Sequence, residues 1–249
     1  MQQAAAPDSL TAGHRDGPPL YGRMMASISS GHKFANKIRF FKLPLILTES
    51  RLYAGAIAQF FWLSETLERQ LQQHASHPMV ARVCGLGLCV TPGYASDLRE
   101  LCGAEWRAVA EAARTSATAL YMADLEKASP VSLVAAAFIL YGALVVGGGK
   151  ATQAKVRKVL PGCEHCVFDV AQDMAEARKQ FKGCFTAIGK EWPEHSATLE
   201  TEAARYMSLN NSVVLAARCW GKTATAAAGA VLAAGVLVVA VTVARWQRQ

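Results

Sequence analysis

The chain has 249 residues, a formal net charge of +7, 52% apolar residues and 18% charged residues. This length forms one large domain or two small ones, and it buries enough surface to fold without disulfides or a structural metal. The composition excludes an intrinsically disordered protein, which would be rich in charge. The basic residues are spread along the chain, so no nucleic acid partner is expected, whereas an anionic membrane surface or an acidic small ligand fits them.

Residues 1–25 are predicted to form a flexible arm, because Pro and Gly recur there without hydrophobic periodicity. From about Ser27 the pattern becomes helical. Ser29 or Ser30 is suited to cap the first helix, and Pro44 is expected to end it because proline cannot donate a backbone hydrogen bond.

The segment 48–73 is predicted to be a long amphipathic helix, because it lacks Pro and its apolar residues recur mostly three and four positions apart. A short helix is expected to follow from Pro78, and residues 85–93 are expected to form a loop. Ser96 is predicted to start the next helix. The segment 106–127 keeps a helical period that nothing stronger than Ser and Thr interrupts, so it is predicted as one helix.

Ser129 and Pro130 are typical of a helix N-terminus, as the capping residue and the first helical position. The helix that they start, over 131–159, is strongly apolar and is interrupted by the triple glycine 147–149. The Pro-Gly pair at 161–162 ends it.

Two last helices are predicted over 175–191 and 197–220. No alternating pattern typical of a β-strand exceeds four residues, and no internal repeat is present. The chain is therefore predicted to be all-α, with a single helical domain over residues 26–220.

A C-terminal tail anchor is predicted over 221–249, because residues 223–244 contain no charged residue. A helix of that length spans roughly 33 Å, enough to cross a hydrocarbon core about 30 Å thick. Basic residues and a tryptophan flank the span, as is typical of a transmembrane helix: Lys222, Arg245, Trp246 and Arg248. The alternative is an alanine-rich core helix, which would normally carry a polar stripe.

The seven cysteines are an odd number, and the first residues lack the apolar region of a secretory signal peptide. We therefore expect reduced thiols in a domain that faces the cytosol, anchored in the endoplasmic reticulum or in the mitochondrial outer membrane. Cys163 and Cys166 have the CxxC spacing of a zinc or redox site. A single CxxC pair fits small buried thiols or a chance spacing in a loop better than it fits a zinc or redox site.

Two features indicate a ligand. The glycines at 147–149 lie inside an apolar helix, where each costs about 1 kcal/mol relative to Ala, and such a cluster bends the helix and admits a flat ligand or another helix backbone. His32 lies near a helix start beside the basic residues Lys33, Lys37, Arg39 and Lys42. A histidine and basic residues facing a glycine-bent helix would suit an iron porphyrin with two carboxylates. Close helix packing and an ordinary exposed histidine are the alternatives.

The stretch 130–141, PVSLVAAAFILY, followed by Val146-Gly147-Gly148, resembles the distal helix of haem oxygenases, P-x-L-L-V-A-H-A-Y-x-R-Y-L-G-D-L-S-G-G-Q, without a gap. Further matches to this family follow in order over roughly residues 26–215. They are Ser30-Gly31-His32, Thr66-Leu67-Glu68, Asp97-Leu98 with Gly103 and Trp106, Phe181-Lys182, and Glu202-Ala203 with Asn210.

The resemblance implies an all-helical domain that holds haem between a proximal helix and a glycine-bent distal helix. It implies a reaction in which O₂ and electrons from a reductase convert haem to biliverdin, CO and iron. His32 would be the axial ligand of the iron. Gly147 and Gly148 would form the catalytic backbone segment that passes close above the porphyrin.

The resemblance also implies further haem-binding residues. Phe138 stands where the family has a Tyr near the haem edge, Lys182 would pair with a haem carboxylate, and Asn210 belongs to the last matched motif. Lys33, together with Lys37 and Arg39, is added to the predicted haem-binding residues from its charge and position alone.

The chain departs from the family pattern on both sides of the predicted haem. The family's distal Asp, which holds the water network that delivers protons to iron-bound oxygen, is replaced by Leu144, after Ala143. The glutamate that hydrogen-bonds the proximal histidine falls at Asn36, and an arginine beyond the F-K motif falls at Thr186. The fold is expected to survive these changes, whereas turnover is in question.

The sequence therefore supports a membrane-anchored haem oxygenase whose partners are haem, a reductase and a membrane. The alternative is a haem-binding, haem-buffering or scaffold protein that keeps the fold without catalysis. A membrane adaptor whose helical domain docks partners is a third and weaker hypothesis.

Overall fold

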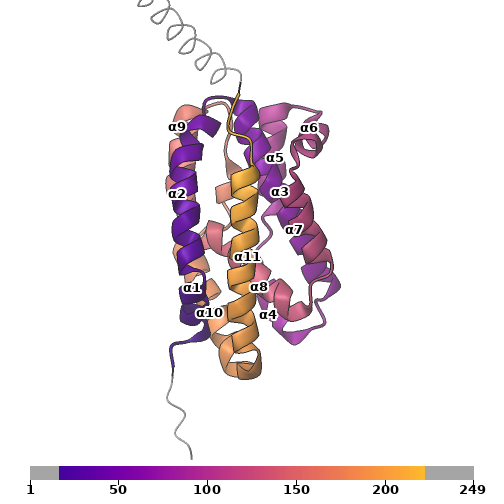
Figure 1. Cartoon of the computed structure of the whole chain (residues 1–249), viewed down its shortest axis with the longest axis vertical. Helices are drawn as coiled ribbons and strands as arrows, with labels where there is room; N and C mark the ends of the chain where they lie inside the picture. Colours follow the sequence, from indigo (N-terminus) through magenta and orange to yellow (C-terminus); the bar gives the residue numbers. More distant parts are fainter. Residues whose placement is uncertain (1–16, 222–249) are drawn as a thin grey trace, which may run out of the picture.

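The computed structural model of the chain describes residues 17–221, which form an elongated bundle of helices (Figure 1). No strand occurs among these residues, which confirms the all-α prediction for this part of the chain. The α-helices are α1 (Leu20–Ser27), α2 (Ser29–Ile46), α3 (Ser50–Gln73), α4 (Pro78–Cys84), α5 (Thr91–Cys102), α6 (Trp106–Ala113), α7 (Ser116–Glu126), α8 (Pro130–Val145), α9 (Gly149–Val159), α10 (Met174–Glu191) and α11 (Ser196–Ala216). Short 3-10 helices lie at η1 (Cys166–Phe168) and η2 (Pro193–His195).

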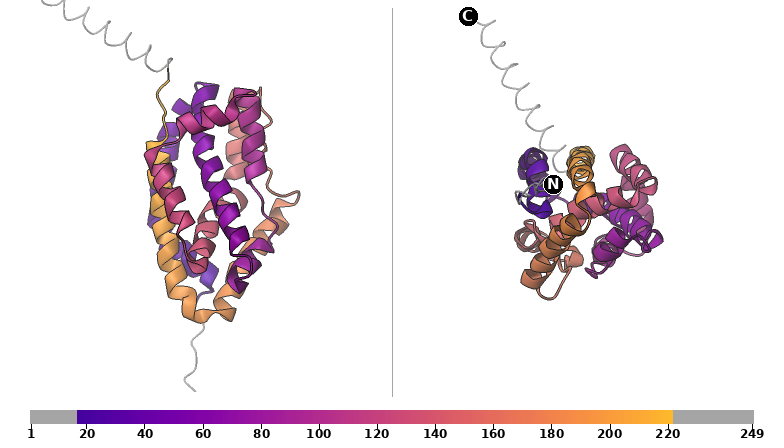
Figure 2. Two further views of the ribbon diagram at one scale, coloured as in Figure 1. Left: turned by 90° about the vertical axis from the view of Figure 1, so that its right-hand side faces the viewer. Right: turned by 90° about the horizontal axis from the view of Figure 1, so that it is seen from below.

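Helix α8 forms the centre of the core. Its side chains from Leu133 to Tyr141 are all buried, and the helix packs against α11, α4, α3 and α10. Figure 2 shows α3 and α11 running along most of the length of the bundle. α3 carries α5, α6 and α7 on one side of the molecule, while α11 contacts α1 and α2 on the other.

The start of α8 follows the sequence prediction, whereas the predicted segment over 131–159 forms two helices, α8 and α9, that are separated at the glycines. Ser129 Oγ accepts a hydrogen bond from the Ser132 N–H at 3.1 Å, and Pro130 occupies the first turn. At the other end, the N–H groups of Val146 and Gly147 both donate to the Gly142 carbonyl at 2.9 Å. The chain then turns through the glycines, and α9 leaves at 53° to α8.

The predicted arm over residues 1–25 is wrong from Leu20 onward, where α1 begins. Leu20 and Met24 are buried in the core, and α1 packs against α10 and α11. A Cβ built on Gly189 of α10 would lie 2.3 Å from Leu20 Cβ, so α10 approaches α1 at a glycine. A helix of only eight residues with one apolar face gives little periodic signal, which explains why the sequence did not reveal it.

Two helix ends differ from their predictions. Pro44 does not end the first long helix, because α2 continues to Ile46, whose side chain is buried in the core with Leu47. α5 begins at Thr91 and not at Ser96. The Glu68 carboxylate accepts hydrogen bonds from the N–H groups of Val90 at 2.6 Å and Thr91 at 3.2 Å, so a distant side chain caps this helix.

The predicted single helix over 106–127 is wrong, because the chain breaks between α6 and α7. The buried Gln59 side chain occupies the break: its Nε2 donates to the Ala113 carbonyl at 2.9 Å and its Oε1 accepts from the Thr115 N–H at 3.0 Å. Thr115 then caps α7 by accepting from the Thr118 N–H. One amide on α3 thus satisfies backbone groups that a continuous helix would have paired internally.

α11 ends at Ala216, four residues before the predicted end at 220. Lys42 Nζ of α2 donates to the carbonyls of Val214 at 3.0 Å and Leu215 at 2.7 Å, which lie in the last turn of α11. The ammonium group therefore pairs with carbonyls that a helix C-terminus leaves unsatisfied.

The predicted membrane anchor over 223–244 lies outside the described residues. Within residues 17–221, no single helix combines the length and apolarity needed to cross a membrane, while α8 and α9 meet that test only together, as the pair bent by 53°.

Candidate functional site

A cavity of about 580 Å³ lies between α2 and α8. Most of its wall is apolar, and it is closed by side chains from α1, α3, α10 and α11. The lining residues from α1, α2 and α3 include Tyr21, Met25, Ile28, His32, Ala35, Asn36, Arg39, Ile46, Ala56 and Phe60. Those from the rest of the chain are Phe138, Ile139, Gly142, Ala143, Val146, Gly147, Gly148, Phe181, Met207, Asn210, Val214 and Ala217.

His32 lines the cavity from the first turns of α2, and a close helix contact fixes its position. A Cβ built on Gly31 would lie 2.8 Å from Met207 Cγ of α11, so only glycine allows the two helices to approach this closely. The Asn211 amide donates to the Gly31 carbonyl at 3.0 Å across the same contact. The imidazole therefore lies on a helix end that is fastened to α11.

The His32 ring has a hydrogen-bond partner one turn further along α2, because Asn36 Nδ2 lies 3.4 Å from His32 Nδ1. The amide oxygen and nitrogen of an asparagine are assigned from their partners, so either can face the ring. With the amide oxygen accepting the Nδ1 proton, the Nε2 lone pair of the imidazole is free to bind a metal ion.

The glycines after α8 form another part of the cavity wall. A Cβ built on Gly147 would lie 2.5 Å from the Ala143 carbonyl oxygen, so the turn at this position requires glycine. A Cβ built on Gly148 would make only ordinary contacts, at 3.7 Å from Arg39 Nη1. The Arg39 guanidinium of α2 therefore reaches the glycine segment across the cavity.

The polar groups of the cavity wall do not include a carboxylate among the described residues; they are Tyr21, His32, Asn36, Arg39 and Asn210. Leu144 is buried and does not line the cavity, whereas its neighbour Ala143 does. Burial raises the pKa of Tyr21 above its usual value of 10.0, so this phenol stays protonated at neutral pH.

The structure brings together most of the predicted site residues: His32, Phe138, Gly147, Gly148 and Asn210 all line the cavity. The Phe138 ring packs edge-on against Tyr21 and Phe185, with centroid distances of 5.8 Å and 4.9 Å. Its position is thus set by an aromatic cluster in the floor of the cavity.

Lys33 and Lys182 do not line the cavity, and both side chains are exposed. Lys182 Nζ lies 5.8 Å from the centroid of the Tyr21 ring, on the outer side of a lining residue. Lys42, which the sequence grouped with the basic residues of this helix, is bonded to the end of α11. Arg39 is therefore the one predicted basic residue that lines the cavity within the described part of the chain.

Sequence reasoning missed the wall that α1 contributes and, apart from Asn210, the wall that α11 contributes. Met207, Asn210 and Val214 of α11, with Ala217 directly after it, recur at spacings of three and four, which is the period of a single helix face. That spacing is a signal that could have found this wall. The α1 wall was missed because its residues lay in the predicted arm.

A family model described as "Heme oxygenase" matches residues 23–215. No curated protein matches the chain.

Solved structures share the fold at low sequence identity. Heme oxygenase 2 from Chlamydomonas reinhardtii, solved without heme, has a TM-score of 0.75 and 24% identity, with 82% of this chain and 100% of that chain covered. Heme oxygenase-2 from Synechocystis, in complex with heme and NO, has a TM-score of 0.69 and 20% identity, covering 79% and 84%. Heme oxygenase-1 from Synechocystis, in complex with heme, has a TM-score of 0.68 and 16% identity, covering 90% and 99%.

Proposed function

The chain belongs to the haem oxygenase family, and on this basis we propose that it binds haem in the cavity between α2 and α8 and cleaves it to biliverdin, CO and iron. The observation that carries the proposal is that His32 and the Gly147–Gly148 segment, far apart in sequence, line one cavity. The volume of about 580 Å³ lies within the range of small-molecule sites.

The residues of the cavity fit haem in several ways. His32 supplies an imidazole whose Nδ1 has a partner in Asn36, which leaves Nε2 for the iron. The absence of side chains at Gly147 and Gly148 lets the backbone lie close to a flat ring. Phe138 and Phe181 supply apolar surface for the porphyrin.

The two carboxylates of haem need cationic partners. Arg39 is suited to this role because its guanidinium reaches into the cavity and offers several donors in a planar fork. Lys33 and Lys182 are exposed outside the cavity wall, so they serve a carboxylate only if it projects beyond that wall.

When bound, haem supplies the iron that binds O₂ and accepts electrons from a reductase. His32, which lines the cavity, would hold the iron through its imidazole. The backbone groups of Gly147 and Gly148 also line the cavity, where they would hold a water molecule. Such a water would take the place of the one that the family's distal Asp orients.

A second function, haem binding without turnover, is favoured by a specific observation. No carboxylate lines the cavity within residues 17–221, and the residue at the position of the distal Asp, Leu144, is buried in the core. A protein with this cavity would hold or buffer haem but would deliver protons to bound oxygen slowly.

The test is a haemin titration of the full-length chain in detergent, followed by a reductase, NADPH and O₂. A Soret band that is lost in His32→Ala supports haem binding through this residue. Bilin absorbance and CO after reduction support the oxygenase, whereas a stable Soret band under the same conditions supports binding alone. The absence of any Soret shift would contradict both functions.

A pair of substitutions separates the two functions further. Ala143→Asp places a carboxylate in the cavity wall, whereas Leu144→Asp places one in the core, where an unpaired charge costs about 3 kcal/mol or more. If slow proton delivery limits the wild type, we expect Ala143→Asp to raise bilin formation. The expected result for Leu144→Asp is a lower thermal unfolding midpoint and no gain in activity.

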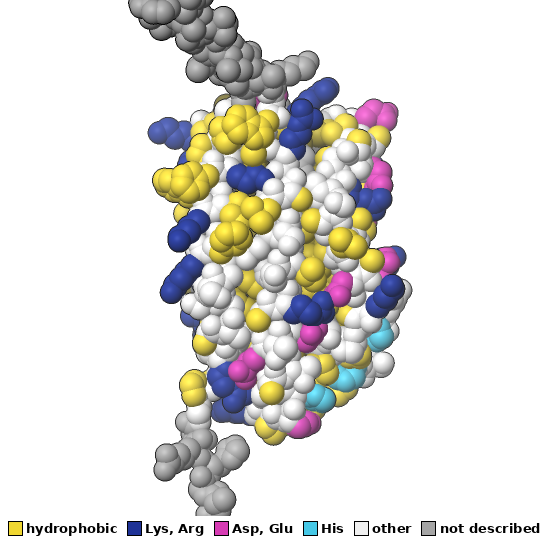
Figure 3. Space-filling model, in the orientation of Figure 1, with side chains coloured by type: hydrophobic (Ala, Val, Ile, Leu, Met, Phe, Trp, Pro, Cys, Tyr) yellow, Lys and Arg dark blue, Asp and Glu magenta, His cyan; other side chains and the backbone are white. Residues whose placement is uncertain are grey.

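We further propose that residues 223–244 anchor the protein in the endoplasmic reticulum or mitochondrial outer membrane, with the helical domain in the cytosol. Figure 3 shows hydrophobic and basic side chains together near the end of the bundle where the described chain finishes. Exposed apolar residues there include Phe40 at 76%, Phe41 at 70% and Trp220 at 58% exposure. Aromatic and basic side chains together suit the headgroup region of an anionic membrane.

A further inference from the structure

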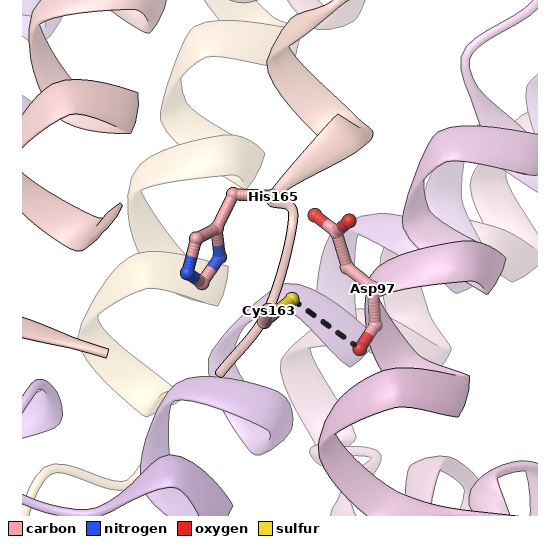
Figure 4. A group of neighbouring side chains, drawn as sticks. All are labelled: Asp97, Cys163 and His165. Atoms are coloured by element: carbon pink, nitrogen blue, oxygen red, sulfur yellow. Dashed lines mark hydrogen bonds between the residues drawn. The ribbon is translucent and has the colours of Figure 1, made fainter. Parts of the chain in front are cut away.

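The loop between α9 and α10 folds back onto α5 and brings three metal-binding side chains together. Cys163 and His165 of this loop meet Asp97 of α5, and one ligand atom from each lies within 4.8 Å of the others (Figure 4). All three residues are buried, with Asp97 and His165 at 0% exposure. The close approach of the loop to α5 is possible because Gly93 carries no side chain, since a Cβ there would lie 3.1 Å from the Cys166 carbonyl oxygen.

One nitrogen of the His165 ring is hydrogen-bonded, whereas the other has no hydrogen-bond partner among the described residues. Its Nε2 lies 2.9 Å from the Leu160 carbonyl, and because a carbonyl only accepts, Nε2 carries the proton of the neutral ring. Nδ1 then has a lone pair, and it is buried without a hydrogen-bond partner among the described residues. Figure 4 shows this side of the ring turned toward Cys163 and Asp97.

The backbone of His165 is held in an unfavourable conformation. Its φ of 56° lies in the left-handed region, which costs a non-glycine residue roughly 1–2 kcal/mol. Gln153 Nε2 donates to the His165 carbonyl at 2.9 Å, and the ring bonds Leu160, so two contacts from α9 and its end maintain this conformation. Strain of this kind is commonly found where a side chain must be placed for a function.

We propose that Asp97, Cys163 and His165 form a binding site for a divalent zinc-type cation. A sulfur, an imidazole nitrogen and a carboxylate oxygen form a donor set that zinc accepts in tetrahedral sites. The Leu160 carbonyl is the hydrogen-bond partner that orients the histidine ligand, as in other metal sites. Water would complete the coordination, and Glu100 and Cys166, which also offer ligand atoms within 4.8 Å of the Asp97 carboxylate, are further donors.

The charges in the cluster support a divalent ion. A thiolate at Cys163 and a carboxylate at Asp97 together carry two negative charges, which the cation neutralises in a buried position. Metal binding forms the sulfur–metal bond and releases the thiol proton to water.

Asp97 retains its other contacts in this arrangement. Its Oδ1 and Oδ2 accept hydrogen bonds from the N–H groups of Cys166 at 2.6 Å and Val167 at 3.1 Å. Each carboxylate oxygen has a further lone pair for the cation. The bound cation would therefore fasten α5, the start of η1 and the loop after α9 at one point.

This site is separate from the proposed haem cavity, because none of its three residues lines that cavity. It can therefore be tested on the haem-free protein, and its failure would leave the proposed haem function unaffected.

The experiment is a Co²⁺ titration of the full-length, haem-free chain in detergent with a metal-free reductant, followed by displacement with Zn²⁺. Co²⁺ reports a thiolate ligand through a sulfur-to-metal charge-transfer band and reports tetrahedral geometry through its visible absorption. We expect both signals to saturate at an equimolar ratio, and we expect Zn²⁺ to remove them and to raise the thermal unfolding midpoint.

Two variants test the ligands and one serves as the matched control. Cys163→Ser and His165→Asn should each lower the Co²⁺ affinity by more than about 100-fold, because losing a ligand exceeds the roughly 10–100-fold effect of losing its hydrogen-bond partner. Asparagine tolerates the left-handed backbone at this position, which keeps the variant folded. Cys184→Ser removes another buried thiol outside the cluster and should bind Co²⁺ like the wild type.

The outcomes are distinct. No charge-transfer band in the folded wild type would overturn the site. A band that persists in Cys163→Ser would place the thiolate elsewhere, and unchanged affinity in folded His165→Asn would remove the histidine from the ligand set; both contradict the proposal.

Discussion

Arg39 differs from the other basic residues of α2 because its side chain reaches the cavity. Its guanidinium lines the cavity beside Gly148, whereas Lys33 and Lys37 do not line the cavity. Charge and proximity to His32 in the sequence could not separate these residues, because neither gives the direction of a side chain around a helix.

We expect Arg39→Ala to weaken haem binding by roughly 10- to 100-fold, the effect of losing a charge-assisted hydrogen bond of about 1.5–3 kcal/mol. Lys33→Ala is the matched control and should bind within about twofold of the wild type. Soret titration measures both. With haem dimethyl ester, which lacks the carboxylate charges, the difference between the two variants should disappear; a difference that persists would show that Arg39 acts through packing.

The buried thiol of Cys184 makes stability depend on pH. Burial raises its pKa from the usual 9.0 to about 11. Above pH 9 the unfolded chain releases this proton while the folded chain keeps it, so the unfolded state binds fewer protons and stability falls as pH rises toward 11.

Cys184→Ala removes this contribution. We therefore expect the gap in unfolding free energy between the wild type and Cys184→Ala to narrow by about 1 kcal/mol between pH 8 and pH 10. Urea unfolding followed by circular dichroism at the two pH values provides the measurement. A constant gap would mean that the folded thiol titrates normally.

At the scale of elements, the helices whose ends carry local signals were predictable. Ser129 and Pro130 mark the start of α8, and the glycines mark its end. The starts of α5 and α7 were not predictable, because Glu68 and Gln59 satisfy their backbone groups from α3, far away in the sequence. A local sequence pattern does not indicate a hydrogen-bond partner that lies on another helix.

The residues of the cavity also divide into those that local motifs predict and those that only tertiary packing brings together. His32 and the glycine segment were recognisable from motifs, whereas the α1 and α11 walls become neighbours of α2 only through tertiary packing. The Asp97–Cys163–His165 cluster is the clearest case, since the CxxC spacing alone carried little weight and α5 supplies the third residue.

The two glycines after α8 should differ in their tolerance of a side chain. Gly147→Ala should destabilise the protein by about 1–3 kcal/mol, because a Cβ would lie 2.5 Å from the backbone oxygen of Ala143. Gly148→Ala should cost less than about 1 kcal/mol, because its Cβ would make only ordinary contacts. Urea unfolding compares the two, and equal losses would contradict a turn that requires glycine only at the first position.

At the scale of the whole molecule, a mutation in the proposed anchor should affect membrane insertion without changing the stability of the helical bundle. Ala234→Arg places a charge near the middle of the span 223–244, at a cost of roughly 2.5–3.5 kcal/mol for membrane insertion. We expect this variant to be released from membranes by alkaline carbonate while the thermal unfolding midpoint of the bundle stays unchanged. Ala234→Leu is the control that remains in the membrane. A core helix would instead show a lower midpoint in the arginine variant.

Helix α2 is fastened to α11 at both ends. Near its start, Asn211 bonds the Gly31 carbonyl, and near its end Lys42 bonds the last carbonyls of α11. Between these points one side of α2 borders the cavity and the other carries exposed residues, among them Phe34, Lys37 and Phe40. Because the middle of α2 borders the cavity and buries only Ile38, we expect this part of the helix to open locally more readily than the fully packed α8.

Amide hydrogen exchange would measure this local opening of α2. Amides in the middle of α2 should exchange faster than those of α8 in the haem-free protein, because local opening requires little loss of packing there. Haem bound to His32 would restrict the motion of α2 and slow amide exchange across the middle of this helix. Lys42→Ala would free one end, so its exchange should quicken toward Ile46 while the amides near Gly31 stay protected.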